Sequence, residues 1–389
     1  MGPPASILER SAVSPWLWWA ALPAFATGLG LLNLATWPRG RRGIRRPSVS
    51  VLVPARNEEA TIEACLRAAL AADPAEIWVY DDGSTDRTFE IVTELSKLDP
   101  RIKRMRGSEL PAGWVGKPHA CHRLSQMASS EVLLFVDADT QLTPDALERF
   151  ADLEARFRTP VITAFPDQVM ATWSERLVVP LLHLTYLSWL PLFLIPRTRT
   201  SAVLAANGQT LWVRRLAYQR IGGFRAVRDA IVDDMAFCRR AKRVGLRVLF
   251  ADGARIARCR MYRSWREVFE GFSKNLYVGL GARPERLAAV SMLYWGAYMA
   301  PAVGVAGGAG APAWVGLGLV ALLRLAVALR YGHPLGWSLV GHPLAVLLFV
   351  WIGLNSMRWS MLGQIRWRGR TYGTRVRSDE GFEPQEASP

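Results

Sequence analysis

The chain has 389 residues, of which 50% are hydrophobic and sixteen are tryptophan. Its formal charge of +15 suits nucleic acid, an anionic membrane surface or phosphorylated substrates as partners. The four cysteines (Cys65, Cys121, Cys238 and Cys259) form no CxxC pair and show no metal-ligand spacing, which argues against a disulfide framework and against a zinc site built on cysteine.

An uncharged segment at residues 15–36 is long enough to cross the hydrocarbon core of a bilayer. Arginines follow this segment instead of preceding it, and no A-x-A cleavage site is evident, so an uncleaved anchor is favoured over a signal peptide. Five arginines then stand in RGRRGIRR, residues 39–46, where contact with anionic lipid is favoured over a nucleic-acid arm. Residues 1–47 are therefore expected to be a membrane anchor and basic linker. By the positive-inside rule, the domain that follows should lie on the cytoplasmic side of the cell (inner) membrane.

Strands and helices alternate between residue 48 and about residue 160. Strands are expected at 48–55, 76–82, 101–107 and 131–139, and helices at 58–72, 84–98 and 119–128. Alternation at this spacing predicts an α/β domain with a mostly parallel sheet and right-handed crossovers. Ligands of such sheets bind beyond the carboxyl ends of the strands, so the polar residues at those ends are the candidates for a site.

The stretch EVLLFVDADTQL, residues 131–142, ends a buried strand on Asp137 and Asp139. On extended chain their side chains project to the same side, about 7 Å apart, so a cation is expected beside them. Polar residues also follow the first and second strands, namely Arg56, Asn57, Glu58, Asp81 and Asp82. Each alone is more often a helix cap or a loop carboxylate, but their shared position at the strand ends predicts a ligand site.

The chain lacks both the GxGxxG fingerprint after its first strand and the P-loop motif, so a different grip on a nucleotide is needed. Carboxylates do not bind phosphate directly, and a divalent ion, Mg²⁺ or Mn²⁺, is therefore expected between them and a diphosphate. Asp139 is the predicted ligand of that metal, with Asp137 contacting the metal or the ribose. Lys117 can supply positive charge to the pyrophosphate. His119 and His122 could also coordinate a metal, although no third ligand is indicated.

An acid pair opens a predicted helix in DAIVDDMAFCRRAKRVG. Asp233 and Asp234 stand at its start and basic residues follow toward its end, which complementarity with the helix dipole would explain. The alternative is a catalytic role, because an acceptor hydroxyl must lose its proton to a base within hydrogen-bond reach.

The C-terminal third contains three further apolar segments, at residues 287–306, 312–329 and 335–357, followed by the basic tail RWRGRTYGTRVR. Arg324 falls inside the second segment, where it must reach the interface or face protein. Three full crossings would place the basic tail outside, against the positive-inside rule, so one of the three is expected to be interfacial or re-entrant. The apolar run at 177–196 contains three prolines and is expected to lie in the interface instead of crossing.

Six short motifs occur in one order along the chain: VPARNEE (53–59), DDGSTD (81–86), GWVGKPHA (113–120), DADT (137–140), NGQTLWVRRLAYQRIGGF (207–224) and DD (233–234). In this order they resemble family-2 glycosyltransferases, enzymes with a GT-A fold that transfer a sugar from a nucleotide donor with inversion. The resemblance covers about residues 48–280. RMYRSWREVFEGFSKNLYVG (260–279) and the closing WRGRTY are most similar to the membrane-bound branch associated with carotenoid and hopanoid glycosylation.

The resemblance implies a role for each matching residue. The nucleotide, expected to be that of a UDP-sugar, would be held by Pro54, Ala55, Arg56, Asn57, Glu58, Asp82, Lys117 and Asp137. Asp139, with Asp137, would bind the metal ion of the DXD motif. Asp234 would be the catalytic base, with Asp233 beside it where the family usually has Glu. On the acceptor side the expected residues are Asn207, Gly208, Gln209, Trp265, Lys274 and Asn275, although a basic amphipathic helix on the membrane surface explains the last three equally well.

These observations predict a membrane-bound, inverting, metal-dependent hexosyltransferase that moves a sugar to a lipid acceptor such as a carotenoid or hopanoid. The expected organisation is a GT-A domain at 48–282, C-terminal membrane helices at 283–360, and a basic and then disordered tail at 361–389. The Q-x-x-R-W motif of polymerising family members is absent, which argues against a polysaccharide or glycolipid synthase coupled to export. A basic, non-enzymatic membrane scaffold is the alternative from another class, and no nucleic-acid partner is expected.

Overall fold

A mixed eight-stranded sheet forms the centre of the protein in the computed structural model, which describes residues 19–107, 109–367 and 370–372. The strand order is β3-β2-β1-β4-β7-β6-β8-β5. The strands are β1 (Val49–Ala55), β2 (Glu76–Asp81), β3 (Ile102–Arg106), β4 (Val132–Val136), β5 (Thr140–Leu142), β6 (Val161–Gln168), β7 (Thr210–Arg214) and β8 (Val248–Cys259). The predicted α/β fold class is therefore confirmed.

The first half of the sheet is parallel. Strands β3, β2, β1 and β4 pair side by side in one direction, and helices α3 (Ile62–Ala71), α4 (Thr88–Leu98) and α5 (Gly116–Met127) connect them. Every residue of β4 is buried, as expected for a parallel strand that is covered on both faces. The carboxyl ends of these strands consequently meet at one edge of the sheet.

The second half of the sheet mixes both directions. Strand β7 is antiparallel to its neighbours β4 and β6, while β8 is parallel to β6 and pairs at its far end with the short β5. Helices α6 (Ala146–Phe157), α9 (Arg215–Ile221) and α10 (Asp233–Arg243) belong to this half. The register of β4 and β7 matches Val136 with Thr210, and it brings the residue after β4 beside the residue before β7.

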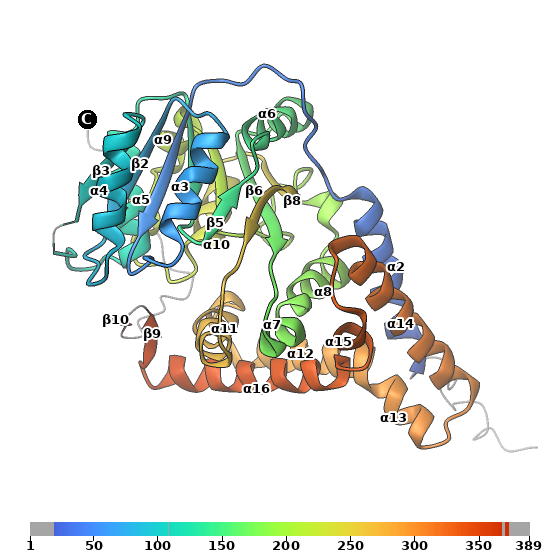
Figure 1. Ribbon diagram of the computed structural model, residues 1–389. Helices are drawn as coiled ribbons and strands as arrows, with labels where there is room; N and C mark the ends of the chain where they lie inside the picture. Colours follow the sequence, from blue (N-terminus) through green and yellow to red (C-terminus); the bar gives the residue numbers. More distant parts are fainter. Residues whose placement is uncertain (1–18, 108, 368–369, 373–389) are drawn as a thin grey trace, which may run out of the picture.

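The remaining helices gather beyond one end of the sheet (Figure 1). They are α2 (Ala21–Thr36), α7 (Trp173–Val178), α8 (Pro180–Trp189), α11 (Trp265–Gly279), α12 (Pro284–Tyr294), α13 (Ala300–Ala306), α14 (Ala311–Tyr331), α15 (Leu335–Leu339) and α16 (His342–Met361). A π-helical turn, η4 (Trp295–Met299), joins α12 to α13, and a small hairpin of β9 (Ile365–Trp367) and β10 (Arg370–Tyr372) follows α16. Short 3₁₀ helices, η2 (Leu192–Leu194) and η3 (Phe224–Val227), complete the described elements.

Three helices of the described residues are long and apolar enough to cross a membrane: 284–306, 311–331 and 342–361. Membrane association is therefore indicated, as predicted. The third segment begins later than the sequence pattern suggested, because residues 335–339 form the separate helix α15 and α16 begins at His342, with Pro343 in its first turn. At the N-terminus α2 has 16 residues, fewer than the roughly 20 that a full crossing needs, and residues 15–18 of the predicted anchor lie outside the described part.

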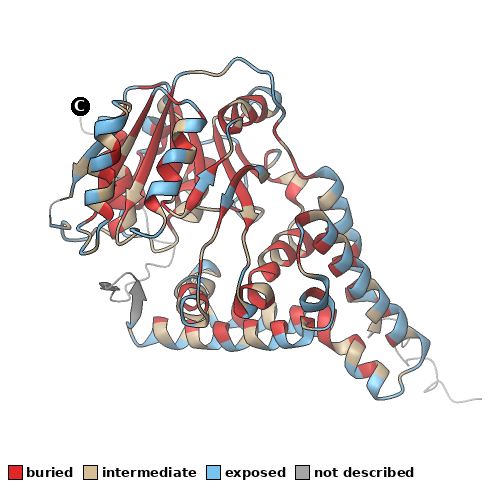
Figure 2. Cartoon of the chain, in the orientation of Figure 1, coloured by how far each residue is buried: buried red, intermediate tan, exposed pale blue. Residues whose placement is uncertain are grey.

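The apolar run at 177–196 is folded into the protein. It ends α7, forms α8 and continues into η2, and none of its residues belongs to the exposed class. Helix α8 packs against α2 on one side, and the ring of His183 lies 4.7 Å from that of Phe165 in β6. Figure 2 shows α7 and α8 largely as buried chain. Contact with other parts of the protein accounts for the apolar character of this run.

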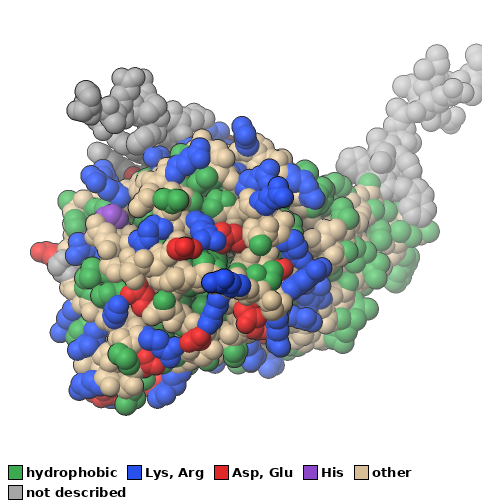
Figure 3. All heavy atoms as spheres, turned by 90° about the horizontal axis from the view of Figure 1, so that it is seen from above, with side chains coloured by type: hydrophobic (Ala, Val, Ile, Leu, Met, Phe, Trp, Pro, Cys, Tyr) green, Lys and Arg blue, Asp and Glu red, His purple; other side chains and the backbone are tan. Residues whose placement is uncertain are grey.

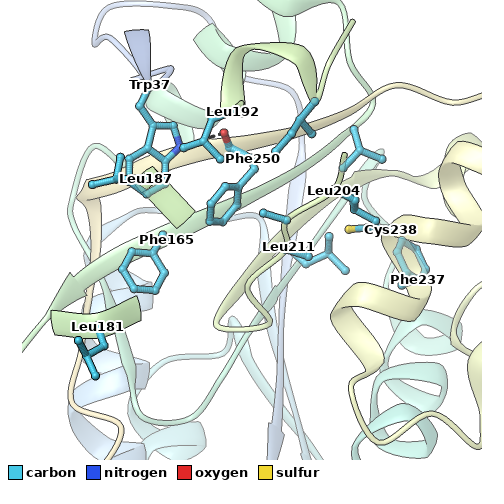
Figure 4. Packing of buried hydrophobic residues seen from close by; sticks show 14 of the residues in the cluster. Trp37, Phe165, Leu181, Leu187, Leu192, Leu204, Leu211, Phe237, Cys238 and Phe250 are labelled. Carbon is cyan, nitrogen blue, oxygen red and sulfur yellow. Dashed lines mark hydrogen bonds between the residues drawn. The ribbon is translucent and has the colours of Figure 1, made fainter. Parts of the chain in front are cut away.

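A cluster of aromatic side chains joins the helical part to the sheet (Figure 4). Trp37, directly after α2, packs on Phe165 and Phe250 at ring distances of 6.4 and 5.3 Å. Its indole nitrogen donates a hydrogen bond to the carbonyl of Phe250 at 3.1 Å. The end of α2 is thus fixed to strands β6 and β8.

Candidate active site

A cavity of about 610 Å³ opens at the carboxyl ends of β1, β2 and β4 and continues between helices α8, α11 and α12. Its polar end carries the charged side chains that follow the strands, and its other end is apolar. This is the position that the strand-end rule predicts for a ligand. All but two of the predicted site residues line the cavity; the exceptions are Asn57 and Trp265.

Lys117 lies among acidic side chains at the polar end. Its Nζ is 2.6 Å from Oδ1 of Asp137 and donates a hydrogen bond to the carbonyl of Gly208 at 3.4 Å. Burial lowers the pKa of Lys117, but the charges of Asp137 and Asp233 outweigh burial and raise that pKa well above its ordinary value. The amine is therefore a fixed positive charge, and the cation expected beside the two strand-end aspartates is present.

Gly208 allows this close approach. A Cβ atom at that position would lie 3.1 Å from Nζ of Lys117 and 3.4 Å from the Cβ of Asp234. Any larger residue would have to displace the amine or the acid pair. The glycine therefore sets the width of the polar end of the cavity.

Asp139 is the third residue after β4. Its Oδ1 accepts a hydrogen bond from the Thr140 hydroxyl at 3.1 Å. Burial, and next the charge of Asp137, raise the pKa of Asp139 to about 6, which is the like-charge effect expected for the pair. An added cation would be stabilised here, because it would offset the repulsion between the two carboxylates.

Among the described residues no group of three or more His, Cys, Asp or Glu is arranged to hold a metal ion. A divalent ion at Asp139 and Asp137 would thus have one or two protein ligands, the arrangement in which phosphate oxygens and water complete the shell. His119 and His122 lie elsewhere: both rings pack on Trp114, at 5.4 and 5.2 Å, and neither lines the cavity.

Asp233 and Asp234 begin helix α10 and line the same cavity, with Asp234 beside Gly208. Oδ1 of Asp234 accepts a hydrogen bond from the backbone of Met235 at 2.8 Å, so the acid pair does interact with the helix start. Burial, followed by the charge of Asp233, raises the pKa of Asp234 to about 6. Burial also raises the pKa of Asp233 even though Lys117 opposes this. At neutral pH Asp234 is mostly ionised yet basic enough to accept a proton.

Hydrogen bonds join the loops after β1 and β2 at the polar end of the cavity. Asn57 has a φ of +53°, a left-handed conformation that asparagine tolerates better than most residues. Its backbone N–H donates to the Ser84 hydroxyl, and its Oδ1 accepts from the N–H of Thr85, both at 2.9 Å. Arg56 donates to the carbonyl of Asp82. Asn57 is therefore used to join the loops, whereas Arg56 and Asp82 reach the cavity.

Helix α11 brings Lys274 and Asn275 to the junction between the polar and apolar ends. Burial, and next the positive charge of Lys117, lower the pKa of Lys274 to about 8. Gln209 also lines the cavity, but its side-chain amide is hydrogen-bonded elsewhere. Its Oε1 accepts from Nε2 of Gln168 at 2.9 Å, and its Nε2 donates to the sulfur of Cys259 at 2.8 Å. These bonds connect the start of β7 to the ends of β6 and β8.

Trp265 lies away from the cavity. It stacks between Trp173 of α7 and Trp351 of α16, at ring distances of 5.5 and 5.9 Å. Trp265 was expected near the entrance of the acceptor, but it does not line the cavity, because the first turn of α11 faces α7 and α16 while its later turns reach the cavity.

The apolar end of the cavity was not anticipated from sequence. Its walls come from α8, α11, α12 and α16, and include Leu181, Leu182, Thr185, Tyr186, Trp189, Leu276, Val290, Leu293, Tyr294 and Phe349. The hydroxyls of Thr185 and Tyr294 are hydrogen-bonded to each other, and the Tyr294 ring stacks on Phe349 at 4.5 Å. Apolar periodicity revealed the helices, but it carries no information on which of them share a cavity.

Comparison with known proteins decides the family. The family model "Glycosyl transferase family 2" matches residues 50–222. These residues are a family-2 glycosyltransferase domain. The matched range covers the parallel half of the sheet, β6, β7 and the strand-end residues of the cavity, so the predicted family and enzyme class are confirmed.

Two relatives of the chain carry names that refer to lipids. The chain is 24% identical over 282 residues to 4,4'-diaponeurosporenoate glycosyltransferase of Staphylococcus haemolyticus, covering 69% of this chain and 74% of that protein. It is 28% identical over 196 residues to beta-monoglucosyldiacylglycerol synthase of a Nostoc species, covering 49% of this chain but only 40% of that protein. Among solved structures, mannosyltransferase PcManGT from Pyrobaculum calidifontis, in complex with GDP-Man and Mn²⁺, is similar with a TM-score of 0.49 and 18% identity. That match covers 86% of this chain and 99% of the other.

Proposed function

We propose that the protein is a membrane-bound, inverting glycosyltransferase that moves a sugar from a UDP-sugar to a lipid acceptor such as a carotenoid or hopanoid. The observation that carries the proposal is a single cavity whose charged end holds the acid groups and whose other end is lined by apolar side chains. A nucleotide sugar suits the first end. A lipid chain suits the second, since burial of apolar surface favours an apolar ligand.

The carboxylates on one wall of the cavity have the chemistry of ligands for a divalent metal. Asp139 and Asp137 are hard oxygen ligands on one wall of the cavity, and the raised pKa of Asp139 reflects the repulsion that a cation would offset. These two residues would hold Mg²⁺ or Mn²⁺, which supplies charge neutralisation for a leaving diphosphate. Lys117 provides a second positive charge for the same phosphates, while Arg56, Glu58 and Asp82 border the space for the nucleoside.

Asp234 is proposed as the general base. Its carboxylate takes the proton of the acceptor hydroxyl while the oxygen forms a bond to the anomeric carbon. The bond from that carbon to the diphosphate breaks, and its electron pair leaves with the phosphate. The charge of Asp233 contributes to the raised pKa of Asp234 and so to its basicity. The hydroxyl must approach from the side opposite the diphosphate, and Asp234, which lies beside Gly208 in the same cavity, is proposed to lie on that side.

The names of the relatives support a lipid acceptor. One names a carotenoid acid and the other a diacylglycerol lipid, so the acceptors differ in shape while both are apolar. The walls of α8, α11 and α12 in this chain offer a comparable apolar space directly beside Lys274 and Asn275.

We also propose that the family-2 domain faces the cytoplasm. Helices α2 and α14 run parallel, as the contacts of Thr27 with Leu319 and of Gly30 with Leu323 show. Both end at the domain, where Arg39 and Arg330 each lie 2.8 Å from the buried Asp252. The opposite ends therefore point away from the domain, and the loop at 307–310 that lies there carries no charge. Lys and Arg side chains instead spread over the domain side, while hydrophobic side chains gather over the helices (Figure 3).

Helix α16 is proposed to lie along the bilayer surface. It is bound to α11 through Asn355, which donates to the Ser273 hydroxyl at 3.0 Å, and through Ser356. Its exposed apolar residues form one stripe: Leu344, Leu347, Trp351, Leu354 and Met361. Helix α11 carries an exposed ion pair, Arg266 with Glu270, that hydrocarbon would not accommodate. Trp173, Trp265 and Trp351 stack in a row. Tryptophan is enriched at the level of lipid headgroups, which suits a position of this row at the bilayer surface. The segments at 15–36, 284–306 and 311–331 then cross, and the basic tail stays on the cytoplasmic side.

The experiment that tests the enzymatic proposal uses purified protein in lipid discs with a panel of labelled UDP-sugars and lipid acceptors. Label is expected in the organic extract, and it should disappear in Asp139→Asn and Asp234→Asn. The control Asp229→Asn removes an exposed carboxylate close to the same helix and should behave as the wild type. Label confined to insoluble polymer would indicate a polysaccharide synthase, and absence of any UDP-sugar turnover would indicate a scaffold.

A further inference from the structure

A second group of polar side chains lies buried among the helices, outside the cavity of the candidate active site. At its centre is Arg324 of α14, which is 1% exposed. Its Nε donates a hydrogen bond to the carbonyl of Ser338 at 2.7 Å. Its two terminal nitrogens, Nη1 and Nη2, are buried and have no hydrogen-bond partner in the described part of the chain.

Other side chains near Arg324 also present buried polar atoms without a partner. They are the Tyr298 hydroxyl, the Ser338 hydroxyl, Nδ1 of His333 and both ring nitrogens of His342. The rings of Tyr298 and His342 are 5.3 Å apart, and the Arg324 charge acts on Tyr298, His333 and His342. We call these five residues the Arg324 cluster; they come from η4, α14, α16, α15 and the loop before it.

The Arg324 cluster has an excess of hydrogen-bond donors and no acid. Within the described residues no carboxylate pairs with Arg324. Asp252 of β8, which lies beside the end of α14, forms ion pairs with Arg39 and Arg330 and accepts a hydrogen bond from the Tyr331 hydroxyl at 3.4 Å. A buried guanidinium without a counter-charge costs several kcal/mol, so a partner that the described residues do not supply is needed.

We propose that the Arg324 cluster binds a phosphate-type oxyanion, either the headgroup phosphate of a membrane lipid or free phosphate. The guanidinium fork matches two phosphate oxygens, and the hydroxyl and imidazole donors around it can complete the set. Arg324 precedes Tyr331 by seven residues, about 10 Å along the helix, so the Arg324 cluster lies near the end of α14 that is docked on the domain. That depth is within reach of a headgroup.

The test uses the full chain, purified and delipidated, and follows its thermal unfolding midpoint. One arm titrates inorganic phosphate against chloride at constant ionic strength. The other titrates a short-chain phospholipid into the same protein in a detergent without phosphate, with the matching diacylglycerol, which lacks the headgroup phosphate, as control. The wild type is expected to show a saturable rise of the midpoint in one arm. Arg324→Gln should weaken the apparent affinity at least about tenfold, because a hydrogen bond to a charged group contributes about 1.5–3 kcal/mol. Arg220→Gln, which removes an exposed arginine of α9, is the matched control and should leave the response unchanged.

The outcomes separate the sources. A response to inorganic phosphate assigns the free ion, and a response only to the phospholipid, without one to the diacylglycerol, assigns a lipid headgroup. Tyr298→Phe removes a single hydroxyl and keeps the ring, so it should fold even where Arg324→Gln fails, and it should weaken the response several-fold. An unfolding midpoint that is indifferent in both arms, or an Arg324→Met variant more stable than the wild type throughout, overturns the proposal and leaves the Arg324 cluster to water alone.

Discussion

Three carboxyl groups of the active-site cavity, those of Asp139, Asp233 and Asp234, lie in surroundings that favour their protonated forms. Burial is the first cause of each raised pKa, with a neighbouring carboxylate adding to it for Asp139 and Asp234. The folded state therefore binds these protons more tightly than the unfolded chain, in which Asp titrates near 4. The stabilisation by protonation is complete below about pH 4 and is lost as the pH rises through about 6.

Replacing Asp234 with Asn should therefore abolish transfer and stabilise the fold at the same time. At pH 7.5 the free energy of unfolding should rise by about 1–3 kcal/mol, since a pKa raised to about 6 corresponds to a penalty of that order. Thermal unfolding at pH 7.5 and at pH 4 measures this. The difference between variant and wild type should shrink at pH 4, where both are uncharged at this position. A midpoint lower than that of the wild type at pH 7.5 would count against the assigned electrostatics.

Replacing Lys117 with Met should weaken nucleotide binding and slow transfer. The amine is the cation beside Asp137, so without it the strand-end carboxylates repel each other more strongly. A bound diphosphate would also lose one of the positive charges that neutralise it. A fall in kcat of about 10²–10³ is expected, the usual effect of losing one group that stabilises developing charge. Calorimetry with UDP and steady-state kinetics check this, with the exposed Lys97→Met as control. Unchanged affinity for UDP would remove Lys117 from the donor site.

For single residues, the sequence indicated which side chains belong to the site better than it indicated which side chains are hydrogen-bonded to each other. The placing of Asp137 and Asp139 at the cavity follows from the strand-end rule, whereas Asp234, at the start of α10, was expected at the site from the family resemblance. The use of Gln209 as a bridge to Cys259 does not follow from the sequence, because the two residues are 50 positions apart and meet only when β7 and β8 take their places on either side of β6. That arrangement is set by the packing of the whole sheet.

Among the elements, α8 shows most clearly where sequence reasoning stops. An apolar run with prolines looks the same whether it meets lipid or protein, because both environments lack water. In the structure the run packs on α2 and β6 and contributes a wall of the cavity. The bounds of α14 were close to the apolar segment expected at 312–329, whereas α16 begins at His342 because residues 335–339 form the separate helix α15.

The apolar end of the cavity makes α8 a target for blocking lipid access. Leu182→Trp adds bulk to that wall and should lower kcat/KM for the lipid acceptor at least about tenfold, since a lost methylene-scale fit alone is worth 10–200-fold in apolar pockets. Binding of UDP should stay within about twofold of the wild type, because the strand-end residues are untouched. Acceptor kinetics together with UDP calorimetry separate the two effects. Leu216→Trp, at a position that is 81% exposed, is the control. Equal loss of acceptor and nucleotide binding would mean that the variant disturbs the fold.

For the whole molecule, the charge pattern and the helix directions agree on one arrangement in the membrane. Asp252 forms ion pairs with Arg39, which follows α2, and with Arg330 at the end of α14. Two helices far apart in sequence are therefore held at the same face of the domain. The sequence alone left a conflict, in which three C-terminal crossings would place the basic tail outside. The proposed position of α16 along the bilayer surface, where it contacts α11 directly, would remove the conflict.

Two introduced cysteines distinguish the arrangements. All four native cysteines are buried, so a membrane-impermeant maleimide should find little background in the folded protein. Ala306→Cys, exposed at the end of α13, should react in intact cells, whereas Gln364→Cys, exposed directly after α16, should react only after permeabilisation. Leu98→Cys, on the surface of the family-2 domain and 76% exposed, marks the cytoplasmic side. If position 364 reacts together with position 306 and apart from position 98, then α16 crosses the bilayer. In that case either α16 would separate from α11, or the exposed Arg266 and Glu270 of α11 would lie in hydrocarbon. The basic tail would also stand outside, against the positive-inside rule.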